Sequence, residues 1–129
     1  LASTPNDLKK ILMPPVEAGL DFLHSSMRRF WESEFEGSDE NLAYWTKKIS
    51  NIPTIGVGSV GLDSDFIDMT APATPTSIDK AIDDIKKQKY DLIAVGRALL
   101  SDYEWVVKMK EGRLNDVIPY TKDALLNLY

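Results

Sequence analysis

Three short apolar runs decide the fold that the sequence predicts: LDFLH at residues 20–24, PTIGVG at 53–58 and YDLIAV at 90–95. Strands buried on both faces of a sheet have this composition, and parallel sheets are covered on both faces. The runs start near Asp21, Thr54 and Asp91, so the repeats are 33 and 37 residues long. A βα unit needs about 30 residues or more. We therefore expect three parallel strands joined by helices, an α/β arrangement.

A helix is predicted before the first run. Ser3 or Thr4 supplies a capping hydroxyl, and Pro5 suits the first turn that follows. The Pro14-Pro15 pair is expected to interrupt or end this helix, because proline lacks the N–H that a helix interior needs. A turn can form again over residues 16–18, with Gly19 as the expected final stop.

Three later helices are predicted from apolar residues at helical spacing. The first follows the turn at residues 37–39. The second begins at Thr76-x-x-Asp79, which resembles a capping box. The third follows Ser101-Asp102 and ends at Gly112. The positions expected to face inward are Leu42, Trp45, Ile49, Ile78, Ala81, Ile82, Ile85, Trp105, Val106 and Met109.

Composition excludes several classes of function. The chain has 129 residues and a formal net charge of −5, which argues against a nucleic-acid partner, since that requires Lys and Arg massed on one face. There is no cysteine, which excludes disulfides, thiolate nucleophiles and Cys-ligated metals and agrees with a cytoplasmic location. No apolar run approaches the ~20 residues that span a bilayer.

The number of strands indicates that something is missing. A closed (β/α)₈ barrel takes eight strands and about 250 residues, whereas an open three-stranded parallel sheet leaves two bare edges. The first residues carry neither an initiator Met nor a signal peptide. We therefore expect either a preceding segment of a longer chain or a partner chain, such as a second copy of this one.

Two consecutive strands end in glycine, the first at Gly58-Ser59-Val60-Gly61 and the second at Gly96-Arg97. Glycine lets backbone N–H groups approach an anion, and a following helix start adds positive dipole. Arg97 offers a planar fork suited to phosphate oxygens. Barrel enzymes often hold phosphate between the loops of their last two strands. The alternative is two ordinary turns and a surface salt bridge, and on these residues the two interpretations are balanced.

Other polar residues are weaker candidates. His24 and Ser25 lie at the end of a strand. They either face a cofactor or belong to a packed strand end in which His24 is hydrogen-bonded, and we favour the second interpretation. Arg28 and Arg29 either approach an anion or pair with Glu32, Glu34 or Glu36. Phe30, Trp31 and Phe35 either line a substrate mouth, cap the barrel or fill a subunit contact, and the residues favour none of these. Asp63, Asp65 and Asp68 lack the glycine and glutamate of an EF-hand, so we expect a solvated loop and no metal site. The long irregular stretch 62–75 is of a length often used for function.

These blocks together resemble a subgroup of the Old Yellow Enzyme family, the FMN-dependent NADH:flavin oxidoreductases or ene-reductases. The matching blocks are FLHSS at 22–26, RRFWE at 28–32, FEG at 35–37, VGSVGL at 57–62 and VGRALLSD at 95–102. The resemblance implies the C-terminal portion of a (β/α)₈ TIM barrel, with residues 1–129 forming the end of helix 5 and βα units 6–8. It implies FMN as cofactor, NADH or NADPH as reductant, and hydride transfer to an activated alkene.

Carried over residue by residue, the resemblance assigns the FMN phosphate to Ser59, Val60, Gly61, Gly96 and Arg97. It places His24 and Ser25 near the flavin ring. The family's substrate-binding and proton-donating residues belong to the earlier half of the barrel, so the catalytic residues are unknown here. We expect the isolated chain to bind FMN weakly or not at all and to be inactive. Two other hypotheses stay open: a non-catalytic, self-assembling barrel fragment, and a barrel isomerase or aldolase that binds a sugar phosphate.

Overall fold

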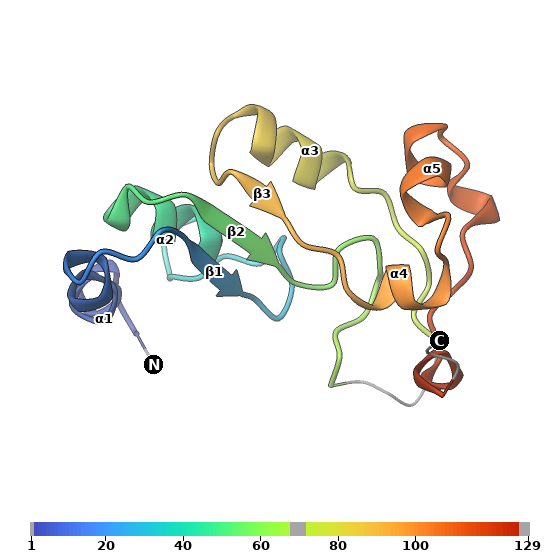
Figure 1. The fold of residues 1–129 in the computed structure, drawn as a ribbon, viewed down its shortest axis with the longest axis horizontal. Coiled ribbons are helices and arrows are strands. Elements are labelled where there is room, and N and C mark those ends of the chain that lie inside the picture. Colours follow the sequence, from blue (N-terminus) through green and yellow to red (C-terminus); the bar gives the residue numbers. More distant parts are fainter. Residues whose placement is uncertain (1, 68–71, 127–129) are drawn as a thin grey trace.

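The computed structural model describes residues 2–67 and 72–126. The described part is α/β, with one small parallel sheet and five α-helices (Figure 1). Its elements are α1 (Pro5–Glu17), β1 (Leu23–Ser26), α2 (Leu42–Ser50), β2 (Thr54–Val57), α3 (Asp79–Lys86), β3 (Leu92–Ile93), α4 (Arg97–Ser101), α5 (Trp105–Lys110) and two 3₁₀ turns, η1 (Leu114–Asp116) and η2 (Lys122–Leu125). In this part of the chain, no helix is both long and apolar enough to cross a membrane.

The prediction of parallel strands joined by helices is confirmed. The strands lie in the order β1-β2-β3, and both pairs are parallel. α2 packs against β1 and β2, α3 packs against β3, and α1 packs against α2. α1 and the α4–α5 segment lie at opposite ends of the molecule (Figure 1), so the carboxyl ends of the strands point toward the α4–α5 end.

The strand bounds differ from the prediction. β1 begins at Leu23, and Phe22 is 59% exposed. β3 has only two residues, although backbone hydrogen bonds continue on both sides of it, from Asp91 N to Thr54 O and from Ala94 N to Gly56 O. An apolar run marks where a strand can form, but only pairing with the neighbouring strand sets its ends.

Only one face of the sheet is covered, so the prediction of strands buried on both faces is wrong for the described chain. Ser25 and Gly56 lie side by side and are buried toward α2. On the other face, His24, Ile55 and Leu92 form one register row, in which His24 is exposed and Leu92 is 61% exposed. The helices of βα units lie on one side here, and nothing in the described residues covers the second side.

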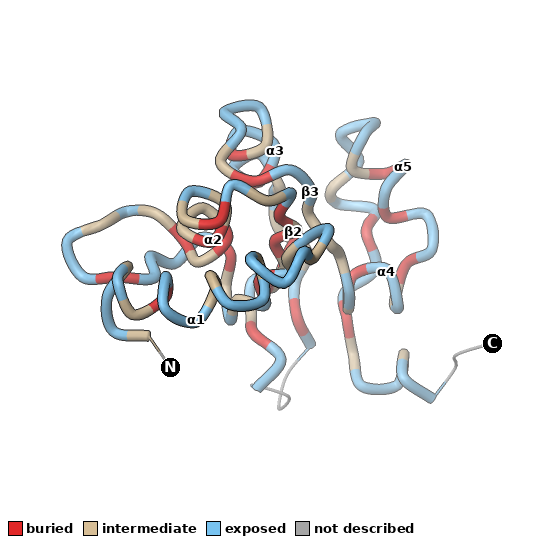
Figure 2. Tube along the Cα trace, turned by 60° about the vertical axis from the view of Figure 1, so that its left-hand side comes forward, coloured by how far each residue is buried: buried red, intermediate tan, exposed pale blue. Residues whose placement is uncertain are grey.

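The Pro14-Pro15 pair neither interrupts nor ends α1, contrary to the prediction. The helix continues to Glu17, and the next backbone bond runs from Ala18 N to Pro14 O. Proline removes a donor but keeps its carbonyl, so a short last turn can still close beyond it. Gly19, at φ +90°, follows the end of the helix and prevents its continuation, as expected. Most of α1 is exposed or half-buried (Figure 2), which limits the cost of the lost donors.

The predicted caps are confirmed in part. Thr4 caps α1, since its Oγ1 accepts a hydrogen bond from Asp7 N. The capping box at Thr76 does not form, because α3 begins only at Asp79. Ser77 Oγ accepts from Asp79 N instead, and Thr76 N is drawn away to the carbonyl of Gly61. A tertiary backbone contact therefore displaces the local cap.

The last helix is amphipathic in a different phase from the one expected. Trp105 is buried and Met109 packs against the core, but Val106 is 57% exposed. Lys108 occupies a buried position, where its Nζ bonds Asp102 at 2.8 Å. Gly112, at φ +72°, terminates the helix as predicted.

The main core cluster lies between α3, α4 and α5 and the loops near the carboxyl ends of the strands. Its loops are pinned by two isolated bridges, Leu62 with Pro75 and Ala73 with Tyr120. The predicted irregular stretch at 62–75 is thus tied at both ends to the rest of the fold. The buried members of the cluster are Phe30, Val60, Leu62, Ala73, Ala81, Ala98, Trp105, Val117 and Tyr120.

Candidate functional site

The segments that follow β2 and β3 meet at one cavity of about 180 Å³. Ser59, Val60, Gly96 and Arg97 all line it, so the structure brings together four of the five residues predicted to grip phosphate. It is also lined by Ser26, Met27, Arg28, Val57, Gly58, Leu62 and Phe66. The parallel pairing explains the convergence, because the carboxyl ends of neighbouring parallel strands meet at one edge of a sheet.

Arg97 joins the two segments. Its Nη2 donates to Ser59 Oγ at 3.2 Å and to the carbonyl of Ser64 at 2.5 Å, and its Nη1 donates to the carbonyl of Asp65 at 3.1 Å. The guanidinium carbon lies 5.4 Å from the ring centroid of Tyr120, within cation–π range. Arg97 is therefore held at the cavity wall by neutral acceptors, and no carboxylate of residues 2–67 and 72–126 forms an ion pair with it.

The three glycines of the two segments have different roles. A Cβ on Gly58 would lie 2.7 Å from the backbone oxygen of Met27, and one on Gly61 would lie 2.7 Å from the ring of Trp105. Packing explains both of these glycines. A Cβ on Gly96 would meet no protein atom within 4 Å. Gly96 is exposed and borders open space, so a ligand can approach its backbone there.

Ser59 is placed by a turn directly after β2. Its backbone is left-handed, at φ +49°, and its carbonyl accepts from Leu62 N. Its hydroxyl donates to the carbonyl of Arg28 at 3.1 Å while accepting from Arg97. This conformation is uncommon for a residue other than glycine, asparagine or aspartate. Gly61, two residues on, packs against Trp105 and does not line the cavity.

The helix dipole expected beyond each strand is only partly present. After β3, α4 starts at Arg97 but has five residues. After β2, the next helix is α3, which begins far along the chain at Asp79. Dipole effects fall off within the first turn of a helix, so the loop after β2 receives none. Any anion affinity of the cavity rests on guanidinium, hydroxyl and backbone N–H groups.

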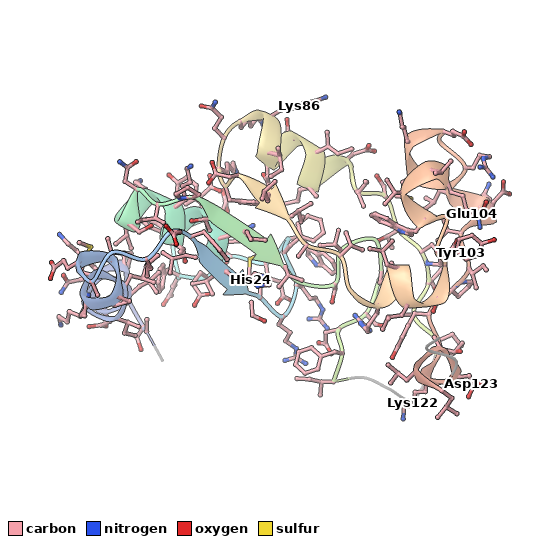
Figure 3. The ribbon with its side chains drawn as sticks, viewed as in Figure 1. His24, Lys86, Tyr103, Glu104, Lys122 and Asp123 are labelled. Carbon is pink, nitrogen blue, oxygen red and sulfur yellow. The ribbon has the colours of Figure 1, made fainter. Side chains whose placement is uncertain are left out.

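His24 and Ser25 are neighbours in sequence but point to opposite faces of the sheet. His24 is exposed on the uncovered face, and it lies on β1 well apart from Tyr103 and Glu104 near α5 (Figure 3). Ser25 is buried, and its Oγ donates to Thr46 Oγ1 of α2 at 3.0 Å. The interpretation of His24 as a packed, hydrogen-bonded residue is wrong, because the register puts its side chain on the face of the sheet that no described residue covers.

The two consecutive arginines pair differently. Arg29 bonds Glu32 at 2.7 Å, as one interpretation predicted, and this bond raises the pKa of Arg29. Arg28 pairs instead with Asp65, a carboxylate that is 1% exposed and that Arg29 also approaches, at 3.0 Å. The prediction of a solvated loop is therefore wrong for Asp65.

Asp65 is the residue that sequence reasoning missed. Its two partners are more than thirty positions away in sequence, and no local pattern links them. Asp63 remains exposed and accepts from Thr74 N, while Asp68 lies outside the described residues. Within residues 2–67 and 72–126, no cluster of His, Cys, Asp and Glu could hold a metal ion.

The aromatic group after β1 is mainly a packing feature. Phe30 is buried in the core cluster, and Phe35 is buried against Trp45 with ring centroids 5.6 Å apart. Trp31 packs its edge on Phe30 and stays partly exposed. A second cavity, of about 380 Å³, lies beside this segment and shares Ser26, Met27 and Arg28 with the first.

No protein-family model matches the chain. The chain is similar to a protein described as NADH oxidase from Thermoanaerobacter brockii, with 35% identity over 123 residues. The similarity extends over 89% of this chain but only 17% of the relative. The chain thus spans less than a fifth of the length of the relative that it matches.

Proposed function

We propose that this chain is the phosphate-holding part of an FMN-dependent oxidoreductase that uses NADH or NADPH as reductant. The observation that carries the proposal is the open space at Gly96, beside the charged Arg97 and the hydroxyl of Ser59, in one cavity. The similarity to a protein described as NADH oxidase supports redox chemistry with a nicotinamide reductant. A flavin links the two, because its phosphate suits the cavity and its ring accepts hydride from NADH.

The residues of the cavity fit a terminal phosphate. Arg97 and Ser59 supply a guanidinium and a hydroxyl, and Val60 and Gly96 supply backbone at the cavity wall. Gly61 acts indirectly in this proposal, because the absence of a side chain lets the ring of Trp105 pack against the turn that carries Ser59. When bound, FMN would supply hydride transfer from its reduced ring to an activated alkene, the reaction implied by the resemblance to Old Yellow Enzyme.

The uncovered face of the sheet supports a larger barrel. Phe22 and Leu92 are large apolar residues with more than half of their surface exposed, and Ile55 lies in register between His24 and Leu92. Inward-pointing residues of a (β/α)₈ barrel pack against the other strands. In this proposal the three strands are the sixth to eighth of such a barrel, and His24 faces its interior at the mouth.

A sugar-phosphate enzyme is the second candidate, since the same cavity would hold its substrate. The similarity to a protein described as NADH oxidase favours the flavin. The absorption spectrum of the purified full-length protein separates the two, because bound FMN absorbs visible light and a sugar phosphate does not. A colourless protein that gains no flavin spectrum on adding FMN would rule out the proposed function.

Two variants test whether Arg97 and Gly96 bind the FMN phosphate. In the full-length protein, Arg97→Ala removes a charge-assisted contact worth about 1.5–3 kcal/mol, so FMN affinity is expected to fall about 10- to 100-fold. Gly96→Ala is expected to weaken FMN by blocking the open space, with little effect on the Kd of riboflavin, which lacks the phosphate. Arg113→Ala is the matched control, since Arg113 pairs with Glu111 and Asp116 away from the cavity. Unchanged FMN affinity in both cavity variants would contradict the assignment.

A further inference from the structure

A buried carboxylate anchors one side of the phosphate cavity. The Oδ2 atom of Asp65 accepts from Arg28 Nε at 2.5 Å and lies 3.0 Å from a terminal nitrogen of Arg29. Its Oδ1 accepts from Ile67 N at 2.9 Å, and its backbone carbonyl accepts from Arg97. Asp65 therefore ties the segment after β1 to the segments after β2 and β3.

Arg28 is held by only one of its donor groups. A guanidinium carries five N–H donors in one plane. Among the described residues, every hydrogen bond of the Arg28 side chain is made by Nε, so its two terminal nitrogens keep four donors for another partner. The side chain is 55% exposed and lines the cavity of about 180 Å³ together with Arg97 and Ser59.

A purely structural role would not need this arrangement. Arg29 is the less exposed of the two arginines and already approaches the Asp65 carboxylate. Arg29 is also compensated by Glu32. Arg28 instead contributes an anchored, half-exposed guanidinium to a cavity that Arg97 also lines. Asp65 compensates Arg28 only through Nε, so the two guanidiniums together present more positive charge to the cavity than one carboxylate offsets, and an anion bound there would be attracted to both.

We infer that Arg28 is a second ligand of the phosphate group, and that Asp65 is the positioning residue that holds it there. The ligand class is a phosphomonoester, whose three terminal oxygens can accept from both guanidiniums, and from the Ser59 hydroxyl once it turns away from the carbonyl of Arg28. This inference rests on the proposed function for the identity of the ligand as FMN. The geometry of the two arginines does not depend on that identity.

The test compares FMN with riboflavin, which differ by the phosphate alone. Dissociation constants are measured for the full-length apoprotein by flavin fluorescence, with Arg28→Ala beside the control Arg113→Ala. The Arg28→Ala variant is expected to lose about 10- to 100-fold in FMN affinity and to keep the riboflavin affinity. An equal loss for both flavins would overturn the inference, because it would indicate a structural defect. An unchanged FMN affinity would also overturn it.

Inorganic phosphate separates this inference from the proposed function. Calorimetric titration with phosphate is run on the same proteins. If the wild type binds phosphate and Arg28→Ala weakens that binding, the inference stands even when FMN does not bind, and only the proposed function fails. If Arg28→Ala binds phosphate as the wild type does, or if the wild type binds neither phosphate nor FMN, the inference is overturned.

A double-mutant cycle tests the role of Asp65. Asp65→Asn keeps the shape but removes the charge that fixes Arg28. FMN affinity is expected to fall in this variant, and the effect is expected to disappear when Arg28 is already alanine, because the two act as a unit. Equal effects of Asp65→Asn in both backgrounds would show that Asp65 does not act through Arg28. Thermal unfolding of each variant confirms that the proteins compared are folded.

Discussion

Gly61→Ala tests whether packing, and not ligand binding, demands this glycine. The new Cβ would lie 2.7 Å from Cζ2 of Trp105, a buried ring in the core cluster. The backbone there has φ +74°, which costs an alanine roughly 1–2 kcal/mol. Forcing extra volume into a packed core adds about 1–3 kcal/mol. The variant is therefore expected to lose about 2–5 kcal/mol of unfolding free energy.

Urea denaturation of the 129-residue chain, followed by tryptophan fluorescence, measures this loss. With a slope of about 2 kcal/mol per molar urea, the midpoint is expected to fall by about 1–2.5 M. Gly96→Ala is the matched comparison, because its Cβ meets nothing within 4 Å, and its midpoint is expected to move far less. If Gly61→Ala unfolds at the wild-type midpoint, or if Gly96→Ala is destabilised as much, the division between packing and binding glycines is refuted.

Three further predictions concern the ion pairs and the uncovered sheet. Asp102→Asn is expected to lower the urea midpoint, because it removes the carboxylate that pairs with Lys108 at 2.8 Å and leaves only the longer contact of Lys108 with Glu104, at 3.7 Å. Burial alone would raise the pKa of Asp91, but hydrogen bonds from Lys47 and from Thr54 N lower it overall. The stability from Asp91 is thus present above pH ~4 and lost as the pH falls further. In urea titrations, the difference in unfolding free energy between the wild type and Asp91→Asn is expected to disappear below that pH. A difference that stays constant with pH would contradict this. The isolated chain is expected to bind FMN weakly and to self-associate in sedimentation, whereas co-purifying flavin or a monodisperse monomer would count against a barrel fragment.

Local signals predicted the elements well where one residue decides the backbone. Thr4 caps the first helix, and Gly19 and Gly112 adopt the positive φ that stops a helix. Short apolar runs located all three strands to within a few residues. Each of these features depends on a hydroxyl, a missing Cβ or a buried run, and none needs a distant partner.

Predictions that depended on a distant partner were less successful. The Thr76 capping box did not form, because the carbonyl of Gly61 binds the Thr76 N–H. Val106 was expected to face inward, but Lys108 is buried in this helix because Asp102 stands beside it. A helical stripe indicates which residues share a face, while the fold decides which face meets the core.

The sequence by itself determined the parallel βα order and the two glycine-ended segments. Their arrival at one cavity was predictable, because parallel strands end at the same edge of a sheet. Only the tertiary structure decided which residues of these segments serve packing and which line the cavity. It assigned Gly58 and Gly61 to packing and left Gly96 open. It also buried Asp65 between arginines from another segment. The reason is physical: contacts between residues more than thirty positions apart depend on where the chain places them, and no local pattern carries that information.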